Sequence, residues 1–342
     1  MGNKLNEHFR FVANKEQGFL RVDKFLVDKI IGTSRNRIQQ AANVGSICAN
    51  NHPIKSNYKV KPGDIITIVM NQPHRELEIA PENIPLNIVY EDDDVIVVDK
   101  PAELVVHPGH DNYTGTLVNA IAGYYSSTTS SIIQSTFYNE DFRSGLVHRI
   151  DKGTSGLLVF AKNLNAKTNL DMQFFRKTIR RNYWAVVWGN VKKEEETIKC
   201  NIGRNLHNRM LMDVFPNNNH GKPAITHYKV LERFEYVTLI ECSLETGRTH
   251  QIRVHMKYIG HVLFNDRRYG GNEILKGNHH TKYKQFVQNC FAICQRQALH
   301  ARVLGFTHPK TGKEILLESP LPKDMILLIE RWRNFSKNLN KP

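Results

Sequence analysis

Cysteine is scarce in this chain, with five residues among 342. Their number is odd and no two of them form a C-x-x-C pair, so the sequence indicates neither a disulfide framework nor a cysteine zinc site. We therefore expect reduced and mostly buried thiols. The five are Cys48, Cys200, Cys242, Cys290 and Cys294.

Long apolar runs are also missing. No segment approaches the roughly 20 apolar residues that a membrane-spanning helix needs, and residues 1–7 lack the apolar core of a signal peptide. We therefore expect a cytoplasmic protein that does not associate with membranes. A length of 342 residues suffices for two domains of typical size.

Acidic residues are few beside the basic ones. The chain has 33 Asp and Glu against 47 Lys and Arg, which gives a net charge of +14. Such a surplus favours a polyanionic partner, because phosphates release counterions when they contact Lys and Arg. Charge alone does not separate DNA, RNA and an acidic membrane surface.

Signatures of cofactors are absent from the sequence as well. It contains no GxxxxGK[ST] phosphate loop and no dinucleotide-binding fingerprint. There are 16 histidines, but the adjacent pair His279 and His280 lies in a polar stretch without Cys or acidic ligands at zinc spacing. The sequence therefore predicts no metal and no organic cofactor.

The most informative stretch that is present begins at His148 and contains Asp151. This Asp lies in a turn rich in Gly, Thr and Ser, directly before the apolar segment 157–162, which predicts a buried strand. An Asp at the mouth of a strand is usually a turn or cap residue. The whole string, however, closely resembles the HRLDxxTSGLLxxAK motif of the RluA-type pseudouridine synthases.

That resemblance implies a role for each polar residue of the motif. In the family the Asp is the catalytic nucleophile, which assigns this role to Asp151. The preceding arginine, here Arg149, enters the RNA helix in place of the target uridine and holds that base outside the stack. We also expect His148 to belong to the RNA-binding surface.

A second string, TGRTHQIRVH over residues 246–255, predicts a helix that Thr249 caps and Gly260 ends. On its period alone, Arg253 is a surface residue of an amphipathic helix. The string resembles the family motif TGRxHQIRVH, in which the arginine of Gln-Ile-Arg pairs with the catalytic Asp. The resemblance therefore implies that Arg253 keeps Asp151 ionised, and that Arg248 and His250 contact RNA.

Tyr183 opens a predicted strand, residues 182–189, after a basic run. Such a Tyr is usually half-buried, with its hydroxyl reaching the surface. In RluA-type enzymes the Tyr of the matching K/R-x-Y-x-A segment stacks on the target base and takes part in proton transfer. The resemblance implies the same role for Tyr183.

Residues 18–72 read as a small module of two short helices and two strands. The pattern RVDKFL…SRNRIQQ…KVKPGD resembles the α-L RNA-binding module, although Asn51-His52 replaces its usual Asn-Gly turn. We expect one phosphate-facing surface on this module, with a solvated charged face as the alternative. Its residues are Arg35, Arg37, Lys55, Lys59 and Lys61.

The rest of the chain predicts a linker over 73–86 and a catalytic domain over 87–335. Strands and helices do not alternate regularly, so a mixed α+β fold with a largely antiparallel sheet is favoured over a doubly wound sheet. Residues 124–142 are expected to form a loop. At position 103, Glu replaces the usual glycine of the family segment KPAGLxVHP, so the local turn is expected to differ in geometry from that of the family.

These observations favour an RNA pseudouridine synthase that works as a monomer. The N-terminal module and the similarity to the RluD-like branch favour large-subunit rRNA as the substrate, with tRNA as an alternative. A catalytically silent RNA-binding or ribosome-assembly protein on the same fold is the rival from another class. An Asp/His nucleic-acid hydrolase is disfavoured, because no paired carboxylates or metal ligands are evident.

Overall fold

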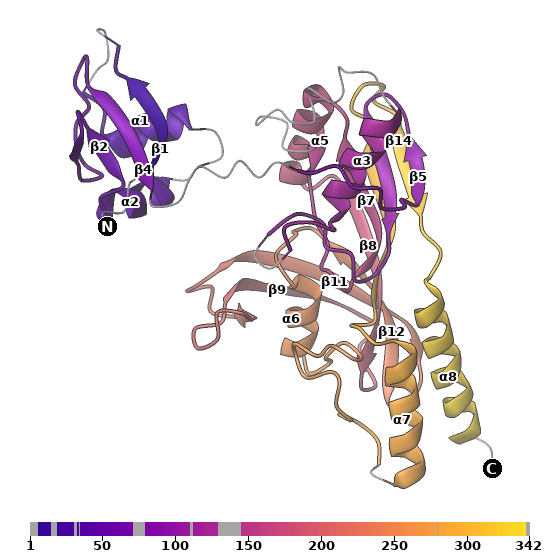
Figure 1. The fold of residues 1–342 in the computed structure, drawn as a ribbon. Coiled ribbons are helices and arrows are strands. Elements are labelled where there is room, and N and C mark those ends of the chain that lie inside the picture. Colours follow the sequence, from indigo (N-terminus) through magenta and orange to yellow (C-terminus); the bar gives the residue numbers. More distant parts are fainter. Residues whose placement is uncertain are drawn as a thin grey trace. The chain divides into compact units, whose positions relative to one another are not determined.

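The computed structural model describes most of the chain, which forms two compact units, Met1–Glu78 and Ile79–Pro342 (Figure 1). Each unit has its own sheet and its own hydrophobic core. No helix among the described residues is long and apolar enough to cross a membrane. The described residues are 6–14, 19–30, 33, 35–70, 79–109, 112–128, 145–278 and 280–339.

The N-terminal unit is a four-stranded sheet with the strand order β1-β4-β2-β3, covered by two helices. The helical spacing of Val22, Phe25 and Leu26 places all three in its core, as the sequence predicts. The elements are β1 (Asn6–Val12), α1 (Val22–Lys29), α2 (Arg35–Asn43), β2 (Ile47–Ala49), β3 (His52–Pro53) and β4 (Ile65–Met70). Strand β1 pairs along β4, so this sheet begins before residue 18.

The turn between β2 and β3 explains how the module dispenses with its usual glycine. Asn50 and Asn51 both have positive φ angles, 50° and 69°, as the two central residues of a tight hairpin turn require. Asparagine tolerates this conformation better than other side chains. The turn is therefore Asn50-Asn51, one residue earlier than the Asn51-His52 expected from the sequence, and His52 belongs to the next strand.

The second unit contains a ten-stranded sheet with the order β10-β9-β11-β12-β8-β13-β7-β6-β5, and β14 pairs with β13. Only β7 and β13 run parallel among the described pairs, so the mixed, largely antiparallel α+β prediction is confirmed. Its strands are β5 (Ile88–Glu91), β6 (Val95–Lys100), β7 (Ser155–Ala161), β8 (Arg180–Trp188), β9 (Glu195–Arg204), β10 (Met212–Phe215), β11 (Lys222–Arg233), β12 (Val237–Leu244), β13 (Leu299–Thr307) and β14 (Glu314–Glu318).

Strand β8 is buried on both faces, because helices cover both sides of the sheet at this point. Tyr183 and Ala185 belong to one core, while Val186 and Trp188 belong to the other, in keeping with the two-residue period of a strand. The helices are α3 (Leu117–Thr128), α5 (Leu164–Arg176), α6 (Gln251–Tyr258), α7 (Thr281–Ile293) and α8 (Lys323–Leu339). Helices α7 and α8 run side by side in Figure 1.

Several segments differ from the sequence-based expectations. Helix α3 continues to Thr128, so the expected loop 124–142 begins later, and residues 129–144 lie outside the described residues. Helix α7 was not predicted. Of the expected linker, residues 71–78 lie outside the described residues, whereas 79–86 packs onto the second unit: Glu82 accepts hydrogen bonds from the backbone N–H of Gly115. The cysteines are free thiols, as expected.

We expect Trp332→Ala to lower the free energy of unfolding by about 3–5 kcal/mol. Trp332 is completely buried on α8 and packs against Trp188, Phe264 and Phe286, so its removal leaves a large cavity. Urea titration measures the effect. Leu327→Ala, on the same helix but 40% exposed, is the matched control and should cost less than about 1 kcal/mol. Equal losses would contradict this packing.

Candidate active site

Asp151 lies in a tight turn directly before β7, closed by a 3.0 Å hydrogen bond from the Thr154 N–H to the Asp151 carbonyl. Its side chain is 21% exposed. The residue lines two adjoining cavities, one of about 810 Å³ and one of about 90 Å³. Its carboxylate is therefore accessible from solvent, although the turn that carries it is packed against the sheet.

Arg253, on α6, joins Asp151 to a second carboxylate. Its Nη1 atom donates to Asp151 Oδ2 at 2.9 Å. Its Nε and Nη2 atoms donate to the two oxygens of Asp266 at 2.7 and 2.8 Å. The planar guanidinium suits this arrangement, because its donors point in fixed directions. Arg253 thereby fixes Asp151 Oδ2 in space and leaves Asp151 Oδ1 free of any hydrogen bond from this side chain.

The second carboxylate makes this buried cation tolerable. The side chain of Arg253 is only 7% exposed, and an unpaired charge at such depth is unfavourable. Burial opposes the positive charge, but the bonds with Asp266 and Asp151 outweigh it and raise the pKa of Arg253. Asp266 was not predicted from the sequence, where it resembles an ordinary turn residue thirteen positions after Arg253.

Helix α6 differs from its sequence-based description in two respects. Its N-cap is His250, in a left-handed conformation with φ 57°, and not Thr249. Every residue from Gln251 to Met256 is buried, so Arg253 is not on a solvent-facing side. The first turn is held by Gln251, whose side-chain oxygen accepts from the Arg248 N–H at 3.0 Å.

His250 lies beside Asp151, with 3.9 Å between His250 Nε2 and Asp151 Oδ1. Its Nδ1 atom is 2.7 Å from the hydroxyl of Tyr269, a residue that the sequence did not single out. Burial lowers the pKa of His250 to about 4, so the imidazole is neutral at neutral pH. The Tyr269 ring also lies 5.0 Å from the guanidinium carbon of Arg253.

Tyr183 lies on β8 and lines the smaller cavity together with Asp151. It is 7% exposed, and burial raises the pKa of its hydroxyl, which therefore stays protonated at neutral pH. The structure thus gathers six of the predicted residues around this cavity. They are Arg149, Asp151, Tyr183, Arg248, His250 and Arg253.

His148 has a different environment from the one predicted. Its Nε2 atom accepts a 3.0 Å hydrogen bond from the backbone N–H of Val159, and its ring packs 4.9 Å from that of Phe174. Burial lowers its pKa to about 3, so it carries no charge for a phosphate. These contacts give His148 a structural role between the turn that carries Asp151 and α5, whereas the neighbouring Arg149 is exposed.

In the loop after β6, Glu103 occupies a backbone conformation in which glycine is the usual residue. Its φ angle is 67°. Lys100, almost fully buried, fastens this loop by donating to the carbonyls of Pro101 and Leu104 at 2.7 and 2.8 Å and to that of Lys152 at 3.0 Å. Lys152 directly follows Asp151, so Lys100 also supports the turn that carries Asp151.

Relatives of this chain cover almost its whole length. It is 44% identical to uncharacterized RNA pseudouridine synthase YlyB of Bacillus subtilis, over 94% of this chain and 97% of that protein. It is 40% identical to ribosomal large subunit pseudouridine synthase D of Nitrosomonas europaea, over 92% of this chain and 85% of that protein. The chain belongs to the RNA pseudouridine synthase family. The family model described as RNA pseudouridylate synthase matches residues 94–258.

Solved structures of the family share the fold of this pseudouridine synthase. Human RNA pseudouridylate synthase domain containing 4 matches with a TM-score of 0.53 and 20% identity, over 72% of this chain and 93% of that one. Human RNA pseudouridylate synthase domain containing 1 matches with a TM-score of 0.51 and 24% identity, over 70% of this chain and 85% of that one. At these identities the likeness supports the fold alone.

An S4 domain matches residues 20–66 of this synthase, the module predicted to bind RNA. Lys55, Lys59 and Lys61 are exposed on it. Arg35 is held differently, because its Nε atom donates to the buried carboxylate of Asp23 at 3.0 Å. That ion pair accounts for Arg35 in the first turn of α2 without a phosphate. The Arg37 side chain lies outside the described residues.

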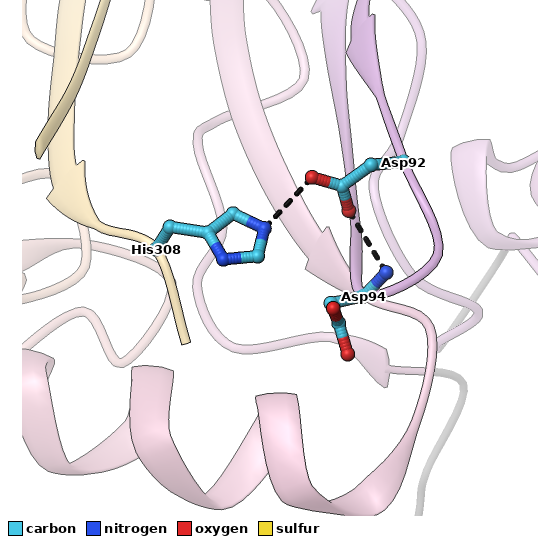
Figure 2. Close-up of side chains that lie close together, drawn as sticks. All are labelled: Asp92, Asp94 and His308. Atoms are coloured by element: carbon cyan, nitrogen blue, oxygen red, sulfur yellow. Dashed lines mark hydrogen bonds and ion pairs between the residues drawn. The ribbon is translucent and has the colours of Figure 1, made fainter. Parts of the chain in front are cut away.

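Asp92, Asp94 and His308 approach one another far along the chain from Asp151 (Figure 2). Both oxygens of Asp92 are already used: Oδ1 accepts from the backbone N–H groups of Asp94 and Val95, and Oδ2 accepts from Tyr90 and His308. His308 Nδ1 accepts two backbone N–H groups, so its Nε2 carries the proton. The cluster is a structural link between two turns.

We expect Arg253→Lys to lower the single-turnover rate of isomerisation about 100-fold. Lysine keeps the charge but cannot bond to both carboxylates in fixed directions, and small misplacements of a reacting group cost about this much. Arg333→Lys is the matched control, since Arg333 makes a similar two-bond pair with Glu232 on the surface of α8. Comparable losses in both variants would contradict the role of Arg253.

Proposed function

We propose that this protein isomerises uridine to pseudouridine in large-subunit ribosomal RNA, with Asp151 as the nucleophile. The observation that carries the proposal is the Asp151 carboxylate, bonded to Arg253 at 2.9 Å and lining the same cavity as Tyr183. The relatives named ribosomal large subunit pseudouridine synthase D support rRNA over tRNA as the substrate.

In this mechanism the carboxylate attacks the target nucleotide and forms a covalent intermediate, which splits one difficult step into two easier ones. The bond between N1 and the ribose breaks, the uracil turns and reattaches through carbon 5, and the bond to Asp151 is broken again. Carbon 5 loses its hydrogen as a proton, and N1 takes up a proton. The reaction is an isomerisation, so it consumes no oxidant, reductant or co-substrate. Arg253 contributes by holding Asp151 Oδ2 in a fixed position through its 2.9 Å hydrogen bond.

The other cavity residues act on the base. The target uridine must leave the RNA stack before Asp151 can reach it, at a cost of about a few kcal/mol. Arg149, exposed at the rim, takes the vacated place in the helix. The Tyr183 ring stacks on the flipped uracil, and its protonated hydroxyl takes part in the later proton transfer. All of these groups come from one chain, so the proposed mechanism requires no residue from a second copy.

Asp151→Asn should abolish isomerisation, by at least about 10³-fold, and leave RNA affinity largely unchanged. The amide is nearly isosteric with the carboxylate but cannot act as the nucleophile. Tritium release from carbon 5 of labelled uridine in transcribed rRNA measures the reaction, and Asp213→Asn, at an exposed position outside both cavities, is the control. Turnover within tenfold of the wild type would rule out Asp151 as nucleophile.

The S4 domain is proposed to bind RNA phosphates through Lys55, Lys59 and Lys61. Replacing the three with Gln should weaken RNA binding and reduce the slope of log affinity against log salt. Each lost phosphate contact lowers that slope by about 0.7–0.9. Titrations at several salt concentrations measure it. An unchanged slope would show that this lysine surface faces something other than RNA.

A further inference from the structure

The hydrogen bonds around Tyr269 determine which nitrogen of His250 carries its proton. The Tyr269 oxygen accepts a 3.1 Å hydrogen bond from the backbone N–H of Met212. Its own hydrogen then needs an acceptor, because Tyr269 is buried and an unpaired hydroxyl there is costly. Among the described residues His250 Nδ1, at 2.7 Å, is that acceptor. The neutral imidazole therefore carries its proton on Nε2.

The carboxylate of Asp151 favours the same form of the ring. His250 Nε2 lies 3.9 Å from Asp151 Oδ1, and a bare nitrogen lone pair facing an anion would be repelled. The distance is too long for a direct hydrogen bond, yet both atoms can bond to one further oxygen at about 2.8 Å each. That oxygen would accept from His250 and donate to Asp151, as only a hydroxyl or water can.

We propose that His250 Nε2–H and Asp151 Oδ1 together bind the 2′-hydroxyl of the target nucleotide, with His250 as donor and Asp151 as acceptor. This assignment rests on the proposed function and adds a specificity determinant to it. A 2′-hydroxyl both donates and accepts, and it is the group by which proteins distinguish RNA from DNA. Arg253 already occupies Asp151 Oδ2, which leaves Oδ1 for the sugar.

The left-handed backbone conformation of His250 is of a kind that is common at functional sites. Its φ of 57° is uncommon for a residue other than glycine, and such strain clusters at binding and catalytic sites. With α6 starting in this conformation, His250 faces Asp151 Oδ1 and Arg253, one turn later, bonds to Asp151 Oδ2. The Tyr269 hydroxyl acts through His250 and is a positioning group.

The target uridine is first identified as the position that loses its modification in a gene-deletion strain. The test then uses synthetic RNA hairpins built around that position. The target position carries pseudouridine, the product, so that no reaction proceeds during titration. One hairpin has ribose at this nucleotide and the other a 2′-fluoro sugar, which keeps the pucker of RNA but cannot donate. The ratio of their dissociation constants measures recognition of the hydroxyl.

We expect the wild-type protein to bind the ribose hairpin at least about tenfold more tightly, and His250→Asn to lower this ratio about fivefold, the value of one neutral hydrogen bond. Asn suits the left-handed backbone, so the fold is retained. Tyr269→Phe removes the hydroxyl that fixes the proton of His250 on Nε2, so it should also lower the ratio. His207→Asn, at an exposed histidine outside both cavities, should leave it unchanged.

The outcomes separate the two proposals. If His250→Asn keeps the wild-type ratio, the hydroxyl site is wrong, even when the protein modifies RNA. If the wild-type protein binds the ribose hairpin no better than one of scrambled sequence, the proposed function itself is contradicted.

Discussion

The guanidinium of Arg253 is the interaction on which the site depends. It is buried, and it bonds to Asp151 and Asp266 at once, so the position of the proposed nucleophile is tied to a carboxylate that solvent does not reach. A buried ion pair seldom adds much stability, but losing one partner is strongly destabilising. Helix α6, which carries Arg253, begins at His250, and the Tyr269 ring packs 5.0 Å from the guanidinium carbon of Arg253.

The turn that carries Asp151 is also held by the C-terminal part of the chain. Buried Arg296 donates to the carbonyl of Gly153 at 2.9 Å and to the hydroxyl of Ser155 at 3.2 Å, and it pairs with Asp324 at the start of α8. At Gly156 the backbone of β13 approaches so closely that a side-chain carbon would lie 2.2 Å from the Ala301 carbonyl oxygen. Two strands far apart in sequence thus meet next to the turn that carries Asp151.

The sequence predicted the residues that lie within continuous motifs, and the structure places Asp151, Tyr183 and Arg253 around one cavity. Residues whose importance arises only from tertiary contacts were missed, such as Asp266 and Tyr269, because nothing in their neighbours distinguishes them from turn and core residues. Periodicity failed for α6 because every residue from Gln251 to Met256 is buried, whichever face of the helix it lies on. His148, inside a motif, packs inward, which shows that membership of a motif does not fix the direction of a side chain.

The most direct measurement of the central claim is a map of pseudouridines in total RNA from a strain that lacks this gene, complemented with either the wild-type protein or the Asp151→Asn variant. The account predicts that one or more pseudouridines of large-subunit rRNA disappear in the deletion, return with the wild-type protein and stay absent with the variant. Return of the modification with Asp151→Asn, or an rRNA map that the deletion leaves unchanged, would contradict it.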